Sequence, residues 1–163
     1  MPMNPARYAQ VEGKAKEVQE GLSVLVGQKL IGARVFLDAT WHFYFGPRDC
    51  LPADQSDKTY LGVECPWRIH NHDAIMIGSE DYDLLEKSTD RQMKILQALI
   101  GDSGLLVESV EADAIGGFRI GLAGAFIFDL FPASDREMEW IFCDVSSQSL
   151  ILMKGVLHKS KPK

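Results

Sequence analysis

The sequence has few cysteines and no long apolar run, and each shortage argues against a class of protein. Its three cysteines form no Cys-x-x-Cys pair, so neither a disulfide framework nor the usual zinc spacing is expected. No apolar run approaches the roughly 18 residues that cross a bilayer, so no membrane span is expected. Residues 1–14 lack the apolar core of a secretory signal. Together these features predict a cytoplasmic protein.

Basic residues are also in short supply, with 17 against 23 acidic ones, and the net charge is −6. An acidic surface repels the phosphates of DNA and RNA, so we expect no nucleic-acid partner. The same surface would favour a basic protein partner. A second interpretation, in which the charge only keeps the protein soluble, stays open.

The common signatures of catalysis and metal binding are missing. The sequence contains no Gly-x-Ser-x-Gly, no glycine-rich phosphate loop with a lysine, and no His-x-x-x-His or Glu-x-x-His pair. His70 and His72 alternate across a predicted turn, so they do not readily face one ion. Cys65 and His42 would suit a nucleophile and its base, but both lie among apolar residues, where a thiol is usually inert. We therefore predict no catalytic residue, no metal and no cofactor.

A first helix is predicted from about residue 5 to residue 25, because apolar residues recur there three and four positions apart. Asn4 is suited to its N-cap and Gly27 to its C-cap. Gly13 and Gly21 lower the helix propensity, so we expect this helix to form by docking on a sheet. Its apolar stripe consists of Tyr8, Val11, Ala15, Val18, Leu22 and Leu25.

A second helix is predicted from residue 90 to residue 100. Thr89 and Gln92 match a capping box, in which two side chains satisfy backbone N–H groups at the start of a helix. Gly101 is suited to the C-cap. The apolar stripe of this helix consists of Met93, Leu96, Leu99 and Ile100.

Apolar and aromatic runs between glycines and prolines predict about eight strands. They lie at residues 30–37, 40–45, 59–65, 74–78, 105–112, 117–122, 125–131 and 137–143. Residues 67–69 extend the third strand beyond a bulge, residues 150–153 form a further short strand, and residues 154–163 are expected to fray. The predicted fold class is α+β: a single domain over residues 1–163, with two helices on a largely antiparallel sheet.

The order helix, four strands, helix, four strands indicates an internal duplication of an α-β4 unit, with halves at residues 5–86 and 88–153. Each helix ends in Leu-x-x-Leu-aliphatic-Gly, at residues 22–27 and 96–101. One strand in each half ends at a proline, Pro66 or Pro132. The alternative is chance similarity between helix ends. A true duplication would make the interface between the halves a natural pocket.

Residues 63–69, Val-Glu-Cys-Pro-Trp-Arg-Ile, and residues 75–81, Ile-Met-Ile-Gly-Ser-Glu-Asp, carry a family resemblance. Together with an upstream aromatic strand that ends in Phe45-Gly46, they resemble a family of uncharacterised bacterial proteins with a Cys-x-Trp-Arg-Ile … Gly-Ser-x-Asp core. The resemblance covers about residues 22–83 and implies no established activity. Small proteins of similar layout occur as immunity proteins beside bacterial toxin genes, so an immunity-type inhibitor is one form of the protein-binding hypothesis by analogy.

Trp67, Arg68, Glu80 and Asp81 are the most distinctive candidate site residues. Neighbouring strands would bring Arg68 close to Glu80 or Asp81, and a guanidinium beside a carboxylate binds polar ligands or a partner side chain. The structural alternative is an ion pair that ties strand ends together while Trp67 covers the core.

Two functions follow from these residues. The first is a non-catalytic protein-binding or interaction module that meets its partner through an acidic sheet edge or the cleft between the halves. The second is a small-ligand-binding protein or enzyme with a cleft around Arg68, Glu64, Glu80 and Asp81. A deep cleft that holds these groups would favour the second function, and a flat, solvated surface would count against it. We interpret the aromatic run at residues 41–45 as core packing, and the alternative is that these rings form the base of a ligand-binding site.

Overall fold

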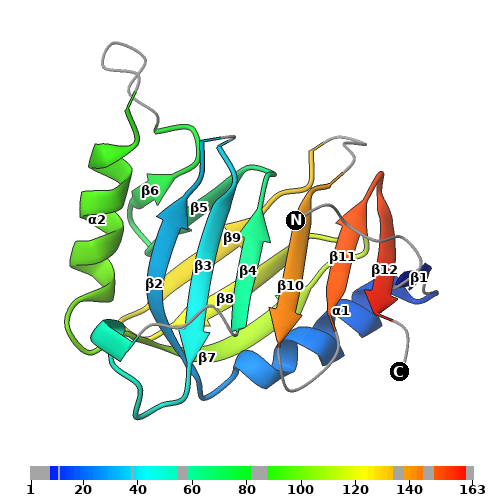
Figure 1. The fold of residues 1–163 in the computed structure, drawn as a ribbon, viewed down its shortest axis with the longest axis horizontal. Helices are drawn as coiled ribbons and strands as arrows, with labels where there is room; N and C mark the ends of the chain where they lie inside the picture. The colour runs from blue at the N-terminus through cyan, green and yellow to red at the C-terminus, as the bar shows by residue number, and fades with distance from the viewer. Residues whose placement is uncertain are drawn as a thin grey trace.

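The computed structural model describes residues 8–10, 12–37, 39–54, 59–81, 88–133, 138–144 and 149–160. Within these residues, twelve strands form one sheet in the order β1-β12-β11-β10-β4-β3-β2-β7-β8-β9-β5-β6 (Figure 1). The strands are β1 (Tyr8–Gln10), β2 (Lys29–Val35), β3 (Trp41–Gly46), β4 (Thr59–Val63), β5 (Trp67–His70), β6 (Ile75–Gly78), β7 (Leu105–Ala112), β8 (Phe118–Leu122), β9 (Phe126–Leu130), β10 (Trp140–Asp144), β11 (Leu150–Met153) and β12 (Val156–Ser160). The helices are α1 (Lys14–Leu22) and α2 (Asp90–Ile100), with short 3₁₀ helices η2 (Ser23–Leu25) and η3 (Pro52–Asp54). The α+β class and the antiparallel pairing are as predicted, although about eight strands were expected.

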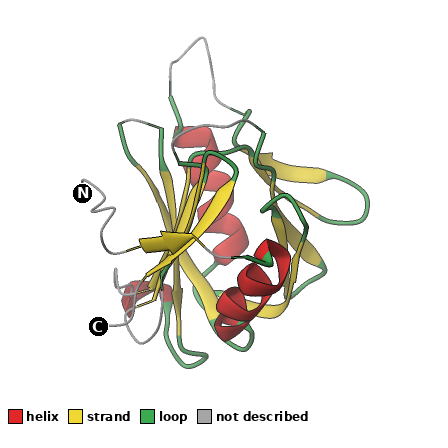
Figure 2. Cartoon of the chain, turned by 90° about the vertical axis from the view of Figure 1, so that its right-hand side faces the viewer, coloured by secondary structure: helices red, strands yellow, loops and turns green. Residues whose placement is uncertain are grey.

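The sheet folds over into two layers that face each other (Figure 2). The layers join where β2 pairs with β7, through only Lys29 with Leu106 and Leu30 with Leu105. Strands β8 and β9 then lie behind β3 and β4 in Figure 1. Phe43 of β3 packs against Phe128 of β9, with 4.7 Å between their ring centroids. The core therefore lies between the layers, where aromatic alternation along the strands places buried side chains.

Both helices lie between the edges of the two layers (Figure 2). Helix α2 packs against β2 and β6, and α1 packs against β7. The apolar stripes predicted from the sequence account for this placement, since Val18 and Leu22 of α1 and Leu96 and Ile100 of α2 are buried. None of the described helices is long and apolar enough to span a membrane.

The strands nearest the β2–β7 pair are arranged symmetrically about it, so that each of them on one side has a counterpart on the other. Their order runs β2, β3, β4, β10, β11 on one side and β7, β8, β9, β5, β6 on the other. In each half the strand after a proline crosses to the opposite layer, so that β5 pairs with β9 and β10 pairs with β4. We call positions related by this order equivalent. A duplicated unit would produce such an order, but the duplication itself stays a prediction.

The first helix begins later than predicted. Tyr8 belongs to strand β1, and α1 starts only at Lys14. Gly13 has φ of 67°, a left-handed conformation that interrupts a helix, so the apolar spacing does not continue through it. Asn4 and Val11 lie outside the described residues.

Three further expectations are wrong. Residues 67–69 do not extend the strand before Pro66, because β5 is a separate strand that pairs with β9. The C-terminal segment is not frayed as far as Ser160, since β12 pairs with β11 and Leu157 is buried. Thr89 makes no side-chain cap to α2, and Gln92 bonds elsewhere. Each error arises from a contact between distant segments, which local patterns do not encode.

Candidate ligand cavity

A cavity of about 800 Å³ lies at one end of the two-layered sheet. Its walls come from the ends of β2, β4 and β6, from the starts of β3 and β5, and from the first turn of α2. Side chains that matter for its chemistry are Arg34, Trp41, Glu64, Trp67, Glu80 and Gln92. The site therefore contains Trp67, Glu80 and Glu64 from the sequence predictions, whereas Arg68 and Asp81 are not among its lining residues.

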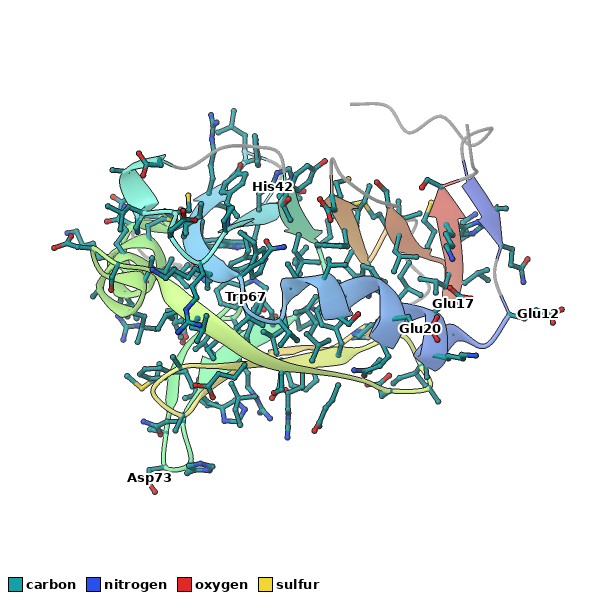
Figure 3. The ribbon with its side chains drawn as sticks, turned by 90° about the horizontal axis from the view of Figure 1, so that it is seen from below. Glu12, Glu17, Glu20, His42, Trp67 and Asp73 are labelled. Carbon is teal, nitrogen blue, oxygen red and sulfur yellow. The ribbon has the colours of Figure 1, made fainter. Side chains whose placement is uncertain are left out.

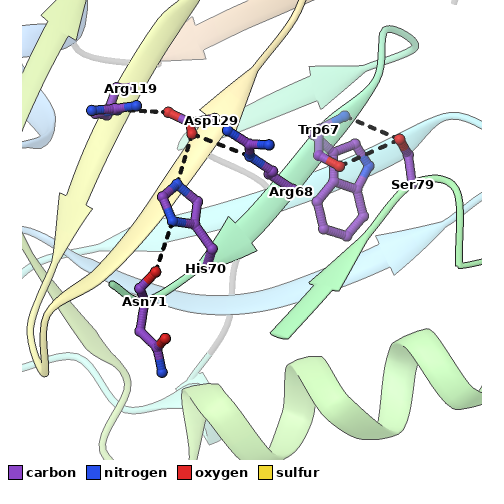
Figure 4. Close-up of polar contacts among 7 residues, drawn as sticks. All are labelled: Trp67, Arg68, His70, Asn71, Ser79, Arg119 and Asp129. Carbon is purple, nitrogen blue, oxygen red and sulfur yellow. Dashed lines mark hydrogen bonds and ion pairs between the residues drawn. The ribbon is translucent and has the colours of Figure 1, made fainter. Parts of the chain in front are cut away.

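Trp67 is fixed at the crossover from one layer to the other. Its backbone N–H donates to Ser79 Oγ at 3.0 Å (Figure 4), and its carbonyl accepts from the Ser79 N–H at 2.9 Å. Its indole packs edge-on against Trp41 at 5.2 Å between centroids. Trp67 is buried, with 2% of its surface exposed. Its buried Nε1–H nevertheless has no hydrogen-bond acceptor among the described residues.

Gln92, which also lines the cavity, has a second unpaired polar atom. Its Nε2 donates to the carbonyl of Gly78 at 2.9 Å and to that of Ser79 at 3.4 Å. Because carbonyl oxygens only accept, these bonds fix the orientation of the amide. The remaining atom, Oε1, is buried and has no donor within the described part of the chain. Ser79 thus bonds both to the backbone of Trp67 and to the side-chain amide of Gln92.

The rim of the cavity is charged. Arg34, Glu64 and Glu80 are exposed there, and the Arg34 guanidinium lies 5.0 Å from the centroid of the Phe36 ring. Glu64 accepts a hydrogen bond from Thr40 Oγ1 at 3.2 Å. The cavity therefore combines aromatic lining residues with a rim on which carboxylates outnumber guanidinium groups, and the two unpaired polar atoms are buried beside it.

The equivalent position in the other half differs in the hydrogen bonding of its tryptophan. Trp67 pairs with Leu130 in β9, and Trp140 pairs with Val63 in β4, so the two tryptophans are equivalent. The indole of Trp140 packs edge-on against Phe118 at 5.2 Å, as Trp67 does against Trp41. However, Trp140 Nε1–H donates to the Gly116 carbonyl at 2.7 Å. The same indole donor is thus satisfied in one half and left unpaired in the other.

The helix residues differ in the same way. Gln92 lies four positions before Leu96, and Val18 lies four positions before Leu22, in the segments that the sequence aligns. Both side chains are buried, at 1% and 0% exposure. One half therefore has an apolar residue where the other has an amide at the cavity. The fold therefore accepts an apolar side chain at this helix position and does not require an amide there.

Arg68 does not meet Glu80 or Asp81 as the sequence analysis expected. Side chains alternate along β5, so Trp67 points into the core and Arg68 points to the outer face. Asp81 Oδ2 instead accepts from the Gly78 N–H at 2.8 Å and closes a local turn. Arg68 Nε lies 3.5 Å from Oδ2 of Asp129 on the neighbouring strand.

Asp129 is the centre of an ion-pair cluster on the outer face (Figure 4). It accepts hydrogen bonds at 2.8 Å from Arg119 Nε and from His70 Nε2. Burial raises the pKa of Asp129, but the hydrogen bonds and charges of Arg119 and His70 outweigh burial and bring the pKa below its usual value. The same hydrogen bond raises the pKa of Arg119. Since the cluster connects β5, β9 and β8, its role is to fix their register.

The sequence analysis missed Gln92 and Arg34 as site residues. The signal for Gln92 was present, because a glutamine four positions before Leu96 lies on the apolar stripe of a helix. It was interpreted as part of a capping box. Arg34 had no local signal, because its place at the rim depends on how the β2–β3 connection lies against the β4–β5 crossover.

Among the described residues, no three His, Cys, Asp or Glu side chains lie close enough together to hold a metal ion. Comparisons of the chain with protein-family models, with curated proteins and with solved structures find no match. The resemblance to a bacterial family with a Cys-x-Trp-Arg-Ile core therefore stays a prediction.

Proposed function

We propose that this protein binds a small organic molecule in the cavity next to Trp67 and Gln92. The observation that carries the proposal is the cavity itself, whose volume of about 800 Å³ is within the range of small-molecule sites. Its lining combines apolar and aromatic residues with the exposed charges of Arg34, Glu64 and Glu80, and such a mixture is typical of ligand sites.

The β2–β3 connection supports this function. In the other half the equivalent connection reaches the indole, where the Gly116 carbonyl accepts from Trp140 Nε1–H. The β2–β3 connection instead borders the cavity through Phe36 and Ala39.

The binding of a basic protein partner, including an immunity-type role, stays a prediction. Small-molecule sites are concave, and a volume of about 800 Å³ is typical of them. For this reason the ligand-binding alternative is favoured over the interaction module.

The test uses the indole N–H signals of the three tryptophans in a ¹H–¹⁵N NMR spectrum, assigned with the single variants Trp67→Phe and Trp140→Phe. A library of small heteroaromatic compounds is screened against the wild-type protein. A compound that binds in the cavity should shift the Trp67 signal and leave the Trp140 signal in place.

Phe36 presents an exposed ring to the cavity, and an aromatic pair contributes about 0.5–1.5 kcal/mol, or up to roughly tenfold in affinity. The variant Phe36→Ala should therefore bind a hit up to about tenfold more weakly, as measured by titration calorimetry. Phe131→Ala removes an equally exposed ring outside the cavity lining and should retain the wild-type affinity. If no compound moves the Trp67 signal, or if hits bind Phe36→Ala as well as wild type, the proposal is wrong.

A further inference from the structure

The outer face of the second layer carries four charged side chains in line across neighbouring strands. Glu111 of β7 pairs with Arg119 of β8. Asp129 of β9 pairs with Arg119 on one side and with Arg68 of β5 on the other. Paired residues of adjacent strands point to the same face, so these four side chains form one row, the charge row, in which the sign of the charge alternates. We infer that the face bearing the charge row docks on the same face of a second copy of this chain, related by a two-fold axis that runs along the strands between β8 and β9.

This face is open to solvent, whereas its counterpart in the first layer is not. On the outer face of the first layer, Tyr44 of β3 and Ile151 of β11 are buried, at 3% and 1% exposure. On the outer face of the second layer, Phe131, directly after β9, is 40% exposed. The described helices leave the outer side of β8 and β9 uncovered (Figure 2). The side chains of Arg68 and Arg119 are also more than one-third exposed, so a partner can reach the charge row without rearrangement.

The alternation of charge makes the row complementary to itself. Rotation about an axis along the strands reverses the order of the row, so that Glu111 of one copy faces Arg68 of the other. In the middle of the row, Arg119 then faces Asp129. Rotation about an axis across the strands would instead place each charge opposite its own copy, and like charges repel. Packed sheets lie about 10 Å apart, a gap that a glutamate and an arginine side chain span together. The charge pattern therefore selects one two-fold arrangement.

Glu111 and Arg68 are the members of the row with the most to gain. Glu111 is exposed and forms no ion pair within the described part of the chain. Arg68 lies 3.5 Å from Asp129, whose oxygens already accept two hydrogen bonds at 2.8 Å from other side chains. A two-fold dimer contains the pair of Glu111 and Arg68 twice, so each copy supplies a carboxylate for the exposed guanidinium of the other.

The apolar side chains of the face fit the same arrangement. Ile127 of β9 pairs with Gly121 of β8 in one copy, so the axis places each Ile127 opposite the Gly121 of the other copy. A glycine leaves room there, because its nearest neighbour is the small side chain of Ser109. The exposed ring of Phe131 lies beside the axis, where the rings of the two copies contact each other.

The balance of charge favours a second copy over a partner of either sign. The two carboxylates and two guanidinium groups of the charge row sum to zero, whereas the whole chain carries −6. A basic partner would find more carboxylates elsewhere on the molecule, and an acidic partner would find no excess of positive charge here. Two copies repel each other through their net charge, and on this face they meet over a neutral surface.

Sedimentation equilibrium of the intact chain over roughly 1 μM to 1 mM tests the inference. Wild type should show a monomer–dimer equilibrium. The substitution Glu111→Lys places a cation opposite Arg68 of the other copy and should weaken the dimer at least about tenfold. The matched control Glu12→Lys makes the same change of net charge, from −6 to −4, at an exposed site before α1 (Figure 3). The control lowers the general repulsion between copies, so it should leave dimerisation unchanged or strengthen it.

A double-mutant cycle with Glu111→Gln and Arg68→Gln tests the pairing itself. Within one copy the two side chains lie three strand spacings apart, about 14 Å, so their effects on the stability of the monomer should add. Across the interface they face each other. Each single variant should weaken the dimer about fivefold, and the double variant should weaken it no further. Circular dichroism at the lowest concentration shows whether each variant is folded.

Three results would overturn the inference. The first is a wild-type protein that stays monomeric up to about 1 mM. The second is a Glu111→Lys variant that dimerises as well as Glu12→Lys, because the contact would then lie on another surface. The third is a double variant in which the two single effects multiply, because Glu111 and Arg68 would then not face each other. None of these results bears on the proposed function, since the charge row is not part of the cavity lining.

Discussion

Asp129 is a charged residue that the fold keeps almost entirely from water, with 4% exposure. It remains ionised because Arg119, His70 and Arg68 surround its two oxygens. The arginine side chains are themselves 41% and 49% exposed, so their charges stay solvated while the carboxylate is buried. The cluster therefore avoids most of the desolvation cost of a fully buried ion pair.

Replacement of Asp129 by Asn should destabilise the protein by about 2–3 kcal/mol, because the charge-assisted hydrogen bonds are lost. Urea unfolding measures this change. The matched control is Asp73→Asn, an exposed carboxylate at the tip of the β5–β6 connection (Figure 3). The control should change stability by less than about 0.5 kcal/mol. Equal effects of the two substitutions would contradict a stabilising role for the cluster.

The same residue predicts a pH dependence. The pKa of Asp129 is lower in the folded protein than its usual value, so protonation favours unfolding. Its contribution is complete at neutral pH and is lost as the pH falls below the unfolded pKa of about 3.9 toward the folded value. The difference in unfolding free energy between wild type and Asp129→Asn should therefore shrink on acidification. A difference that stays constant or grows between pH 7 and pH 3 would refute this.

Helix α1 depends on a glycine for its close approach to the sheet. A Cβ atom at Gly21 would overlap Cδ1 of Leu150, which is 1% exposed and cannot move aside easily. Gly21 lowers helix propensity, yet it permits α1 to pack against β11. The lost propensity is offset by docking, which agrees with the expectation that this helix does not form alone.

The substitution Gly21→Ala should destabilise the protein by about 1–2 kcal/mol, because overpacking outweighs the roughly 1 kcal/mol gained in helix propensity. The exposed neighbour Glu20→Ala is the control and should be nearly neutral. In a Leu150→Ala background, Gly21→Ala should instead be neutral or stabilising. If Gly21→Ala has the same effect in both backgrounds, the predicted steric conflict does not exist.

For the whole molecule, the exchange of strands between the halves matters most. Strand β4 needs β10 from the second half, and β9 needs β5 from the first. Neither half can pair all of its described strands alone, so we expect the described elements to unfold as one cooperative unit. The predicted boundary between the repeat halves near residue 87 would then lie within one domain.

Chemical unfolding should therefore show a single transition, with the same midpoint by far-UV circular dichroism and by tryptophan fluorescence. Separate fragments of residues 1–87 and 88–163 should each be largely unfolded, and mixing them should restore structure. A fragment that folds alone with a cooperative transition would contradict the importance of the exchanged strands.

The sequence determined the local elements of this protein. Apolar spacing located α2 at its observed bounds and the buried stripe of α1, and glycine, proline and aromatic runs located most strands to within a few residues. Strand alternation also predicted the burial of Trp41 and Phe43. These features are local, because periodicity and turn chemistry act over a few neighbouring residues.

Only the tertiary structure decided the partners of these elements and the composition of the cavity. Arg68 binds Asp129 rather than Glu80, and Gln92 bonds to Gly78 rather than capping its helix. Trp67 was singled out from the sequence, but the sequence did not indicate that its indole N–H is unpaired while that of Trp140 donates to a carbonyl. Such contacts join segments far apart in the chain. Their geometry follows from the crossing of strands between layers, which no local pattern records.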